Sequence, residues 1–211
     1  MKNILLIGGA GYVGSVITSH FLKLGFKVRV LDNFVYCNQY SISPFIGDPN
    51  YEIFYGNFGD NKVLSNASKG MDNVVILGGL VGDPITKKYP NESEIINEKS
   101  IKSCIDFFDN KHINKIIFIS TCSNYGLIKE NELADENFEL KPLSLYAKAK
   151  VSAEKHLLSK KGLEITKKNS DYYVDSFEFQ WAFCRFFWES HVLLPEIKTT
   201  TLENWNMALV N

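Results

Sequence analysis

Short apolar runs alternate with segments of helical period along the first two-thirds of the chain. Five runs read as strands: Ile4–Ile7, Val28–Leu31, Tyr51–Tyr55, Asn73–Leu77 and Lys115–Ile119. Between the first two, apolar residues recur every three or four positions from residue 13 to residue 24, which is typical of one face of a helix. Further helices are expected over about 61–68, 92–110 and 143–159, and a long loop over 33–50.

This alternation predicts an α/β fold with a doubly wound parallel sheet of the Rossmann type. Strands that are apolar throughout are typical of parallel sheets buried on both faces. A helix between successive strands implies right-handed crossovers. In such sheets ligands bind at the carboxyl ends of the strands.

The pattern changes after residue 166. All 14 glycines lie at or before Gly162, whereas the three tryptophans all follow it. We therefore expect residues 1–166 to form one domain and residues 167–211 to be a divergent tail. On this interpretation the sheet ends at the fifth strand, because the tail shows no sustained period of 2 or 3.6.

A glycine-rich turn connects the first predicted strand to the first predicted helix. Glycines at its first, fourth and seventh positions permit a tight turn, a close approach to a pyrophosphate and close packing of the helix. The N–H groups at the start of the helix can then bind phosphate oxygens. The residues expected to bind a dinucleotide here are Gly8, Gly11, Tyr12, Val13 and Gly14.

An acidic residue, Asp32, ends the second strand, eighteen residues beyond Gly14. A carboxylate there can accept hydrogen bonds from both ribose hydroxyls and would repel a 2′-phosphate. Asn33 follows it, where an arginine would have favoured NADP, and is also expected to contact the cofactor. The sequence thus predicts NAD as the cofactor.

Tyr146 and Lys150 are four residues apart on a predicted helix and so share one face. A lysine ammonium beside a tyrosine is expected to lower the pKa of its phenol, together with the positive nicotinamide ring. Tyr146 could then accept a proton while hydride leaves the same carbon of the substrate. Lys150 could also bind the nicotinamide ribose, and both residues are expected to contact the cofactor. Just after the fifth strand, hydroxyl residues of the stretch 120–126 are expected near this pair.

The glycine turn, Asp32, Ser-Thr-Cys-Ser-Asn-Tyr-Gly at 120–126 and Tyr-Ala-Lys-Ala-Lys at 146–150 together resemble the NAD-dependent epimerase/dehydratase family, the extended short-chain dehydrogenases. The resemblance spans about residues 1–166. It implies that Thr121 holds the reacting sugar oxygen, that Tyr146 is the base and that Lys150 is its partner. Additional cofactor contacts are implied at Asn57, Phe58, Leu77, Gly78, Gly79 and Asn97.

The same resemblance implies a nucleotide-sugar substrate and a homodimer formed through the helices 92–110 and 143–159. Family members that eliminate water have Asp-Glu after the threonine, whereas Cys122 and Ser123 stand here. Epimerisation of the UDP-glucose 4-epimerase type, or a related oxidoreduction, is therefore favoured. The substrate domain that normally follows is expected to be missing or replaced. Two interpretations stay open: an epimerase, whether active or truncated and inactive, and a non-catalytic NAD-binding or regulatory module derived from one.

Composition and charge narrow the range of partners. With a formal net charge of −1, the chain lacks the excess of basic residues typical of nucleic-acid-binding proteins. No apolar stretch approaches the ~18 residues of a membrane span, and a cytoplasmic protein is expected. The four cysteines and four histidines show no metal-ligand spacing, so no metal site is predicted.

Overall fold

The computed structural model describes residues 2–109, 111, 113–128, 134 and 138–160, and the backbone of 172–175. The chain divides into two units, Met1–Phe177 and Glu178–Asn211, and every described residue belongs to the first. The predicted boundary after residue 166 lies outside the described residues and stays a prediction.

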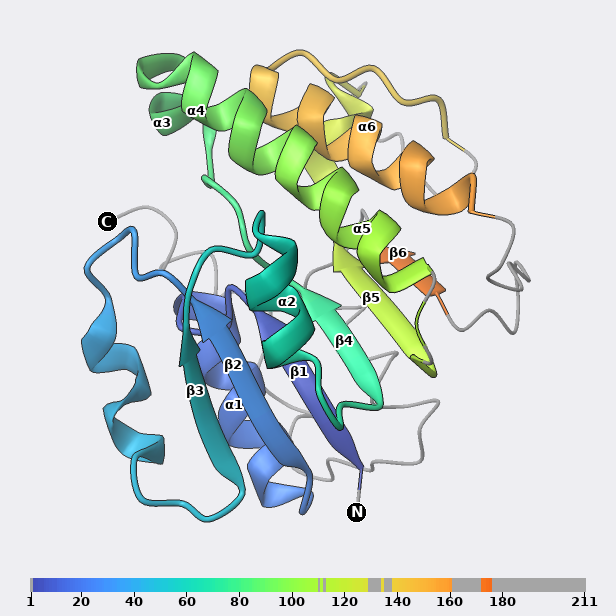
Figure 1. Ribbon diagram of the computed structural model, residues 1–211. Coiled ribbons are helices and arrows are strands. Elements are labelled where there is room, and N and C mark those ends of the chain that lie inside the picture. Colours follow the sequence, from blue (N-terminus) through green and yellow to red (C-terminus); the bar gives the residue numbers. More distant parts are fainter. Residues whose placement is uncertain are drawn as a thin grey trace, which may run out of the picture. The chain divides into compact units, whose positions relative to one another are not determined.

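A parallel sheet forms the centre of the first unit (Figure 1). Its spatial order is β3-β2-β1-β4-β5-β6, and every neighbouring pair is parallel. The order reverses between β1 and β4, which is the topological switch point of a Rossmann fold. The predicted fold class is therefore confirmed. The strands are β1 (Asn3–Ile7), β2 (Lys27–Asp32), β3 (Tyr51–Tyr55), β4 (Asn73–Ile76), β5 (Lys115–Ile119) and β6 (Tyr172–Asp175).

The sixth strand corrects one expectation. The sheet does not end at β5, because Tyr172–Asp175 pairs in parallel with Ile116–Ile119. Hydrogen bonding of the backbone defines this pairing. A strand of four residues carries too short a side-chain pattern to be recognised from its period.

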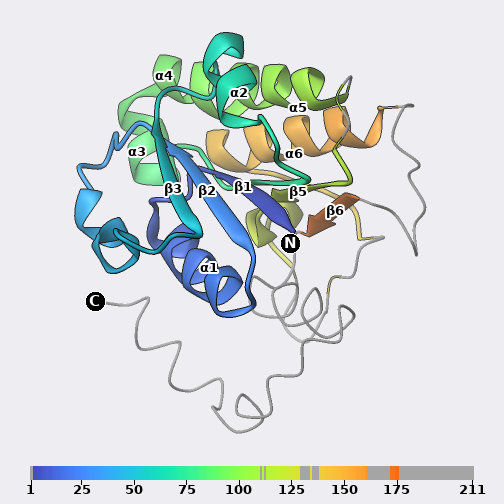
Figure 2. The same cartoon turned by 60° about the horizontal axis from the view of Figure 1, so that its bottom comes forward.

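Helices cover both faces of the sheet (Figure 2). Helix α1 (Tyr12–Lys23) lies on one face. Helices α2 (Asn61–Ala67), α5 (Ile101–Asp109) and α6 (Leu145–Leu158) lie on the other. The main apolar core is on the second face, where buried side chains of β1, β4 and β5 meet those of α2, α5 and α6. The helical elements that follow α1 (Tyr12–Lys23) are η1 (Gln39–Phe45), α2 (Asn61–Ala67), α3 (Asp83–Lys88), α4 (Pro90–Glu94), η2 (Ile95–Ser100), α5 (Ile101–Asp109), η3 (Cys122–Tyr125) and α6 (Leu145–Leu158).

Local sequence signals account for several helix ends. The Ser144 hydroxyl accepts a hydrogen bond from the Ala147 N–H and so caps α6, as predicted. Gly25 has a φ of +76° just after α1 ends, and its N–H donates to the Leu22 carbonyl. The predicted helix 92–110 is a helical stretch from residue 90 to 109 with a π-helical segment, η2, in its middle. The predicted loop 33–50 contains a 3-10 helix, η1.

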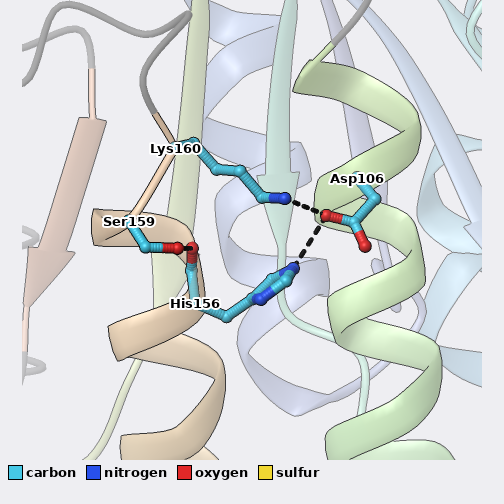
Figure 3. Close-up of polar contacts among 4 residues, drawn as sticks. All are labelled: Asp106, His156, Ser159 and Lys160. Atoms are coloured by element: carbon cyan, nitrogen blue, oxygen red, sulfur yellow. Dashed lines mark hydrogen bonds and ion pairs between the residues drawn. The ribbon is translucent and has the colours of Figure 1, made fainter.

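Helices α5 and α6 are joined by a small polar cluster (Figure 3). Asp106 on α5 accepts a hydrogen bond from His156 Nε2 at 2.8 Å and forms an ion pair with Lys160, just beyond α6. Partial burial raises the Asp106 pKa, but the bonds from Lys160 and His156 outweigh this and leave that pKa below its ordinary value. The cluster links the ends of two helices that both pack on the core.

Candidate active site

The turn after β1 meets the turn after β4 at very short range. Gly8 has a φ of +76°, and a Cβ built on it would lie 2.4 Å from the Gly78 Cα. The N–H groups of Leu77 and Gly78 both donate to the Ile7 carbonyl at 2.9 Å. The two turns thus approach backbone to backbone at the switch point, which only glycine allows.

The start of α1 fits the phosphates of a dinucleotide. A Cβ on Gly14 would lie 2.3 Å from the Gly9 carbonyl oxygen, so α1 packs directly against the turn. The N-cap of α1, Gly11, makes no side-chain cap, and a Cβ built on it would meet only the Gly8 carbonyl, at 3.4 Å. The N–H groups of the first turn, which includes Tyr12 and Val13, are therefore left for an anion.

Asp32 organises the glycine turn through its carboxylate. Oδ2 accepts the Ala10 N–H at 3.0 Å, and Oδ1 accepts the Phe34 N–H at 2.8 Å. Each carboxylate oxygen can accept a second hydrogen bond, so two acceptor positions are left for ribose hydroxyls. Asp32 is thus placed both to brace the turn and to fit a cofactor ribose.

Two of the residues predicted to contact the cofactor lie beside the turn after β4, and they contribute to it in different ways. Asn97 is fully buried in η2, accepts the Leu80 N–H at 2.7 Å and donates to the Leu80 carbonyl at 2.9 Å. A Cβ built on Gly79 would lie 2.8 Å from Asn97 Oδ1. Asn97 is therefore a positioning residue for the turn in this structure. Phe58 contributes its ring, which a Cβ on Gly78 would approach to 2.9 Å.

Asn33 and Asn57 are exposed and hold local turns. Asn33 Oδ1 accepts the Val35 N–H at 3.2 Å, and Asn57 Oδ1 accepts the Gly59 N–H at 2.8 Å. Their Nδ2 groups make no hydrogen bond within the described residues. Both side chains can thus offer donors to a cofactor, and their predicted contacts stay predictions.

Lys150 is held in the interior beneath Tyr146. The residue is 3% exposed, and its Nζ donates to the Ile119 carbonyl at 2.8 Å. Nζ lies 5.8 Å from the centroid of the Tyr146 ring and 4.6 Å from that of Phe118. Burial lowers the Lys150 pKa to about 8. The predicted pairing on one helix face is present, but the ammonium is bound to a backbone carbonyl.

The surroundings of Tyr146 in the protein raise the pKa of its phenol. The predicted lowering depends on the nicotinamide charge as well as on Lys150, and it stays a prediction. Burial, and to a smaller extent the nearby Tyr36, Cys122 and Asp83, raise the Tyr146 pKa to about 12. Desolvation of the phenolate outweighs any benefit from Lys150 here. The phenol is therefore protonated at neutral pH, and its use as a base requires an additional positive charge.

Thr121 lies between β5 and η3. Side chains of α6 form hydrogen bonds to the residues on either side of it. The Thr121 hydroxyl caps η3 by accepting the Ser123 N–H at 3.3 Å. Glu154, one turn after Lys150, is 9% exposed and accepts hydrogen bonds from Ser120 Oγ at 3.2 Å and Asn124 Nδ2 at 2.9 Å. Lys150 and Glu154 thus bind the residues directly before Thr121, while η3 packs on α6.

Three residues of this region were missed from the sequence. Glu154 had a detectable signal, because it continues the spacing of four from Tyr146 and Lys150. Tyr36 and Asp83 had none: one lies in a loop without periodicity and the other in a short helix between two turns. The Tyr36 hydroxyl accepts the Val81 N–H at 3.0 Å and so ties the loop after β2 to the segment after β4.

The described ranges also contain no group of three or more acidic, histidine or cysteine side chains that could hold a metal ion. In the same ranges, no helix has the length and apolar character needed to cross a membrane.

Comparison with known proteins agrees with this arrangement. The sequence model of the NAD dependent epimerase/dehydratase family matches residues 4–163. A UDP-glucose 4-epimerase of Lacticaseibacillus casei is 27% identical over 154 residues, which are 72% of this chain and 45% of that protein.

Two solved structures are similar in fold. The UDP-glucuronic acid 4-epimerase of Bacillus cereus, in complex with UDP-glucuronic acid and NAD, superposes with a TM-score of 0.67 at 23% identity, over 74% of this chain and 51% of that one. The dTDP-glucose 4,6-dehydratase of Bacillus anthracis, in complex with NAD, gives 0.66 at 24% identity, over 74% and 49%.

The chain therefore belongs to the NAD dependent epimerase/dehydratase family, as its motifs suggested, and NAD is the cofactor of that family. It spans about half the length of the relatives it matches.

Proposed function

We propose that the chain is the cofactor-binding and catalytic part of an NAD-dependent nucleotide-sugar 4-epimerase. One observation carries the proposal. The turns that fit a dinucleotide lie at the switch point of the sheet. At the same edge, where the strands have their carboxyl ends, Lys150 binds the carbonyl of the last residue of β5, close in sequence to Thr121. Tyr146 stands one helical turn before Lys150.

The contacts described above support the following roles. The glycine turn and the start of α1 would hold the pyrophosphate of NAD, and Asp32 would hold its adenosine ribose. Thr121 binds the reacting hydroxyl of the sugar through its own hydroxyl, and Tyr146 takes the proton from that hydroxyl. Bound NAD supplies a hydride acceptor and a positive charge, and that charge favours the phenolate that burial alone disfavours. Lys150 fixes the position of α6 relative to the end of β5 through its hydrogen bond to the Ile119 carbonyl.

The two residues after Thr121 favour epimerisation over elimination of water. Cys122 and Ser123 are both exposed at the start of η3, and neither is a carboxylic acid. Dehydration needs an acid for the departing hydroxyl and a base for the neighbouring carbon. A thiol and an alcohol are poorly suited to both tasks.

Turnover assays test the function directly. The full chain with NAD is incubated with UDP-glucose, UDP-N-acetylglucosamine and dTDP-glucose, and products are identified by proton NMR. A 4-epimer that is absent with Tyr146→Phe supports the proposal. A 4-keto-6-deoxy product would contradict epimerisation. NAD binding with no turnover of any sugar would instead support the second candidate, a non-catalytic NAD-binding module.

Cofactor choice is tested separately. Because the Asp32 carboxylate would face a 2′-phosphate, calorimetry should give NAD at least about tenfold tighter binding than NADP. Asp32→Asn should reduce this preference, and it should also weaken NAD binding because the Ala10 and Phe34 N–H groups lose a charged acceptor. Equal affinity of the unaltered chain for both cofactors would contradict the role of Asp32.

A further inference from the structure

Three polar side chains form a hydrogen-bonded ring that spans Thr121 in the sequence. Asn124 Nδ2 donates to Glu154 Oε2 and to Ser120 Oγ, both at 2.9 Å, and Ser120 Oγ donates to the same Glu154 oxygen at 3.2 Å. Asn124 and Glu154 are both buried. Thr121 follows Ser120 directly and comes three residues before Asn124. The ring therefore ties both sides of Thr121 to α6.

The Glu154 oxygen orients the other two members of the ring. Because Oε2 only accepts, the Ser120 hydroxyl and the Asn124 amide must both turn hydrogens toward it. Asn124 Oδ1 is buried in this orientation, and no group in the described part of the chain donates to it. Turning the amide over would place Oδ1 against the Glu154 oxygen. Glu154 thus decides how Asn124 lies, at the cost of one buried acceptor.

The turn that contains Thr121 is held only weakly by its own hydrogen bonds. The Ser123 N–H donates to Thr121 Oγ1 and the Asn124 N–H to the Thr121 carbonyl, each at the long distance of 3.3 Å. The two bonds from Asn124 Nδ2 are shorter, and one of them goes to a carboxyl oxygen. The ring is therefore the stronger constraint on where Thr121 lies.

We propose that Glu154 is a positioning residue that sets the place of Thr121 by acting through Ser120 and Asn124. This inference rests on the proposed function, in which Thr121 binds the reacting hydroxyl of the sugar. Tyr146 and Glu154 are eight residues apart on α6, so the helix that carries the base also holds the turn that carries Thr121. Loss of the ring should displace Thr121 from the sugar, and a displacement of about 1 Å can lower a rate by roughly 100-fold.

Steady-state kinetics on the NAD-loaded full chain test this role, with rates given per chain that has bound NAD. Glu154→Ala should lower kcat by roughly 10- to 100-fold, with KM for the sugar little changed. NAD affinity should be retained, because Asp32 and the glycine turn keep their contacts. A role in folding alone would reduce the amount of NAD-bound chain and leave its kcat intact, and that result would overturn the inference.

The matched control is Glu98→Ala. Glu98 also holds α6, since it accepts the Ser152 hydroxyl at 2.8 Å, but it is not a member of the ring. Its removal should leave kcat close to that of the unaltered chain. An equal fall of kcat in Glu98→Ala and Glu154→Ala would overturn the inference, because any loosening of α6 would then suffice.

An exchange of the acid and the amide tests the ring itself. Asn124→Asp sets two carboxylates against each other and should lower kcat at least as far as Glu154→Ala. Adding Glu154→Gln to it restores one donor and one acceptor in reversed order, and the Ser120 hydroxyl can rotate to suit. The double variant should therefore recover most of the lost kcat. A double variant that binds NAD but recovers no kcat would overturn the inference.

Hydrogen exchange of the full chain, measured by NMR, needs no sugar. The N–H groups of Ser123 and Asn124, which bind Thr121, should exchange faster in Glu154→Ala and at an unchanged rate in Glu98→Ala. Unchanged exchange in Glu154→Ala would show that Glu154 does not hold Thr121. If the unaltered chain turns over no sugar, the proposed function fails and the role in the reaction fails with it, while the exchange rates still decide whether Glu154 holds the turn.

Discussion

The close approach of the turns after β1 and β4 can be tested by substituting two glycines that share one backbone conformation. Gly8 and Gly25 both have a φ of +76°, but their surroundings differ. A Cβ on Gly8 would lie 2.4 Å from the Gly78 Cα and 2.5 Å from its nitrogen, whereas a Cβ on Gly25 would have no neighbour within 4 Å. Gly25→Ala therefore measures the cost of the left-handed backbone alone.

The expected magnitudes follow from this difference. An alanine in the left-handed region costs about 1–2 kcal/mol in either position. At Gly8 the added methyl also meets backbone atoms that cannot rotate away, and overpacking of this kind costs a further 1–3 kcal/mol or so. Gly8→Ala should thus lower the free energy of unfolding by roughly 2–5 kcal/mol, against about 1–2 kcal/mol for Gly25→Ala.

Urea denaturation of both variants and of the unaltered chain measures these free energies. The midpoint should fall further for Gly8→Ala than for Gly25→Ala, with the slope of each transition unchanged. Calorimetry should show that NAD affinity falls for Gly8→Ala and is retained for Gly25→Ala, because Gly25 lies at the far end of α1. Equal destabilisation by the two substitutions would refute the argument that the two turns touch.

Three further outcomes are expected. Because burial lowers the Lys150 pKa to about 8 from an ordinary value of 10.5, the unfolded chain binds more protons between these pH values, and stability should rise with pH across that window by up to about 3 kcal/mol. Lys150→Met should remove this rise in urea titrations at pH 8 and 10.5, and an identical pH dependence in both proteins would contradict the burial of its charge. Asp106→Asn should cost no more than about 1 kcal/mol, since the carboxylate is half exposed. That cost should shrink in 1 M NaCl, and a cost independent of salt would mean that charge is not what joins α5 to α6. Asn97→Ala should cost about 2–4 kcal/mol in the same assay, because the buried N–H and carbonyl of Leu80 lose their partner, whereas a loss under 1 kcal/mol would show that the turn is held elsewhere.

Many features of the fold and of the site could be predicted from local sequence. The apolar runs predicted five of the six strands, and Ser144 and Gly25 marked helix ends, because capping and left-handed turns depend on a few adjacent residues. The glycine turn, Asp32 and the Tyr146–Lys150 pair were recognisable for the same reason. In each of these patterns the residues are close in sequence, so their spacing determines how they are arranged in space.

Other features depended on residues far apart in the chain. The pairing of β6 with β5 and the contact of Gly8 with Gly78 join distant segments, and no local period encodes them. The rise of the Tyr146 pKa on burial could not be predicted from the sequence, because it depends on how deeply the phenol is buried and on which groups surround it.

The sequence by itself thus determined the class of fold, the family and its cofactor, and it predicted that Tyr146 and Lys150 share one helix face. Only the tertiary structure buried Tyr146 and brought Tyr36, Cys122 and Asp83 near enough to raise its pKa. The physical reason is that hydrogen bonds within a turn or helix are set by neighbouring residues. Desolvation and charge–charge interactions, in contrast, depend on distances in space, and these are fixed only when the strands of the sheet come together.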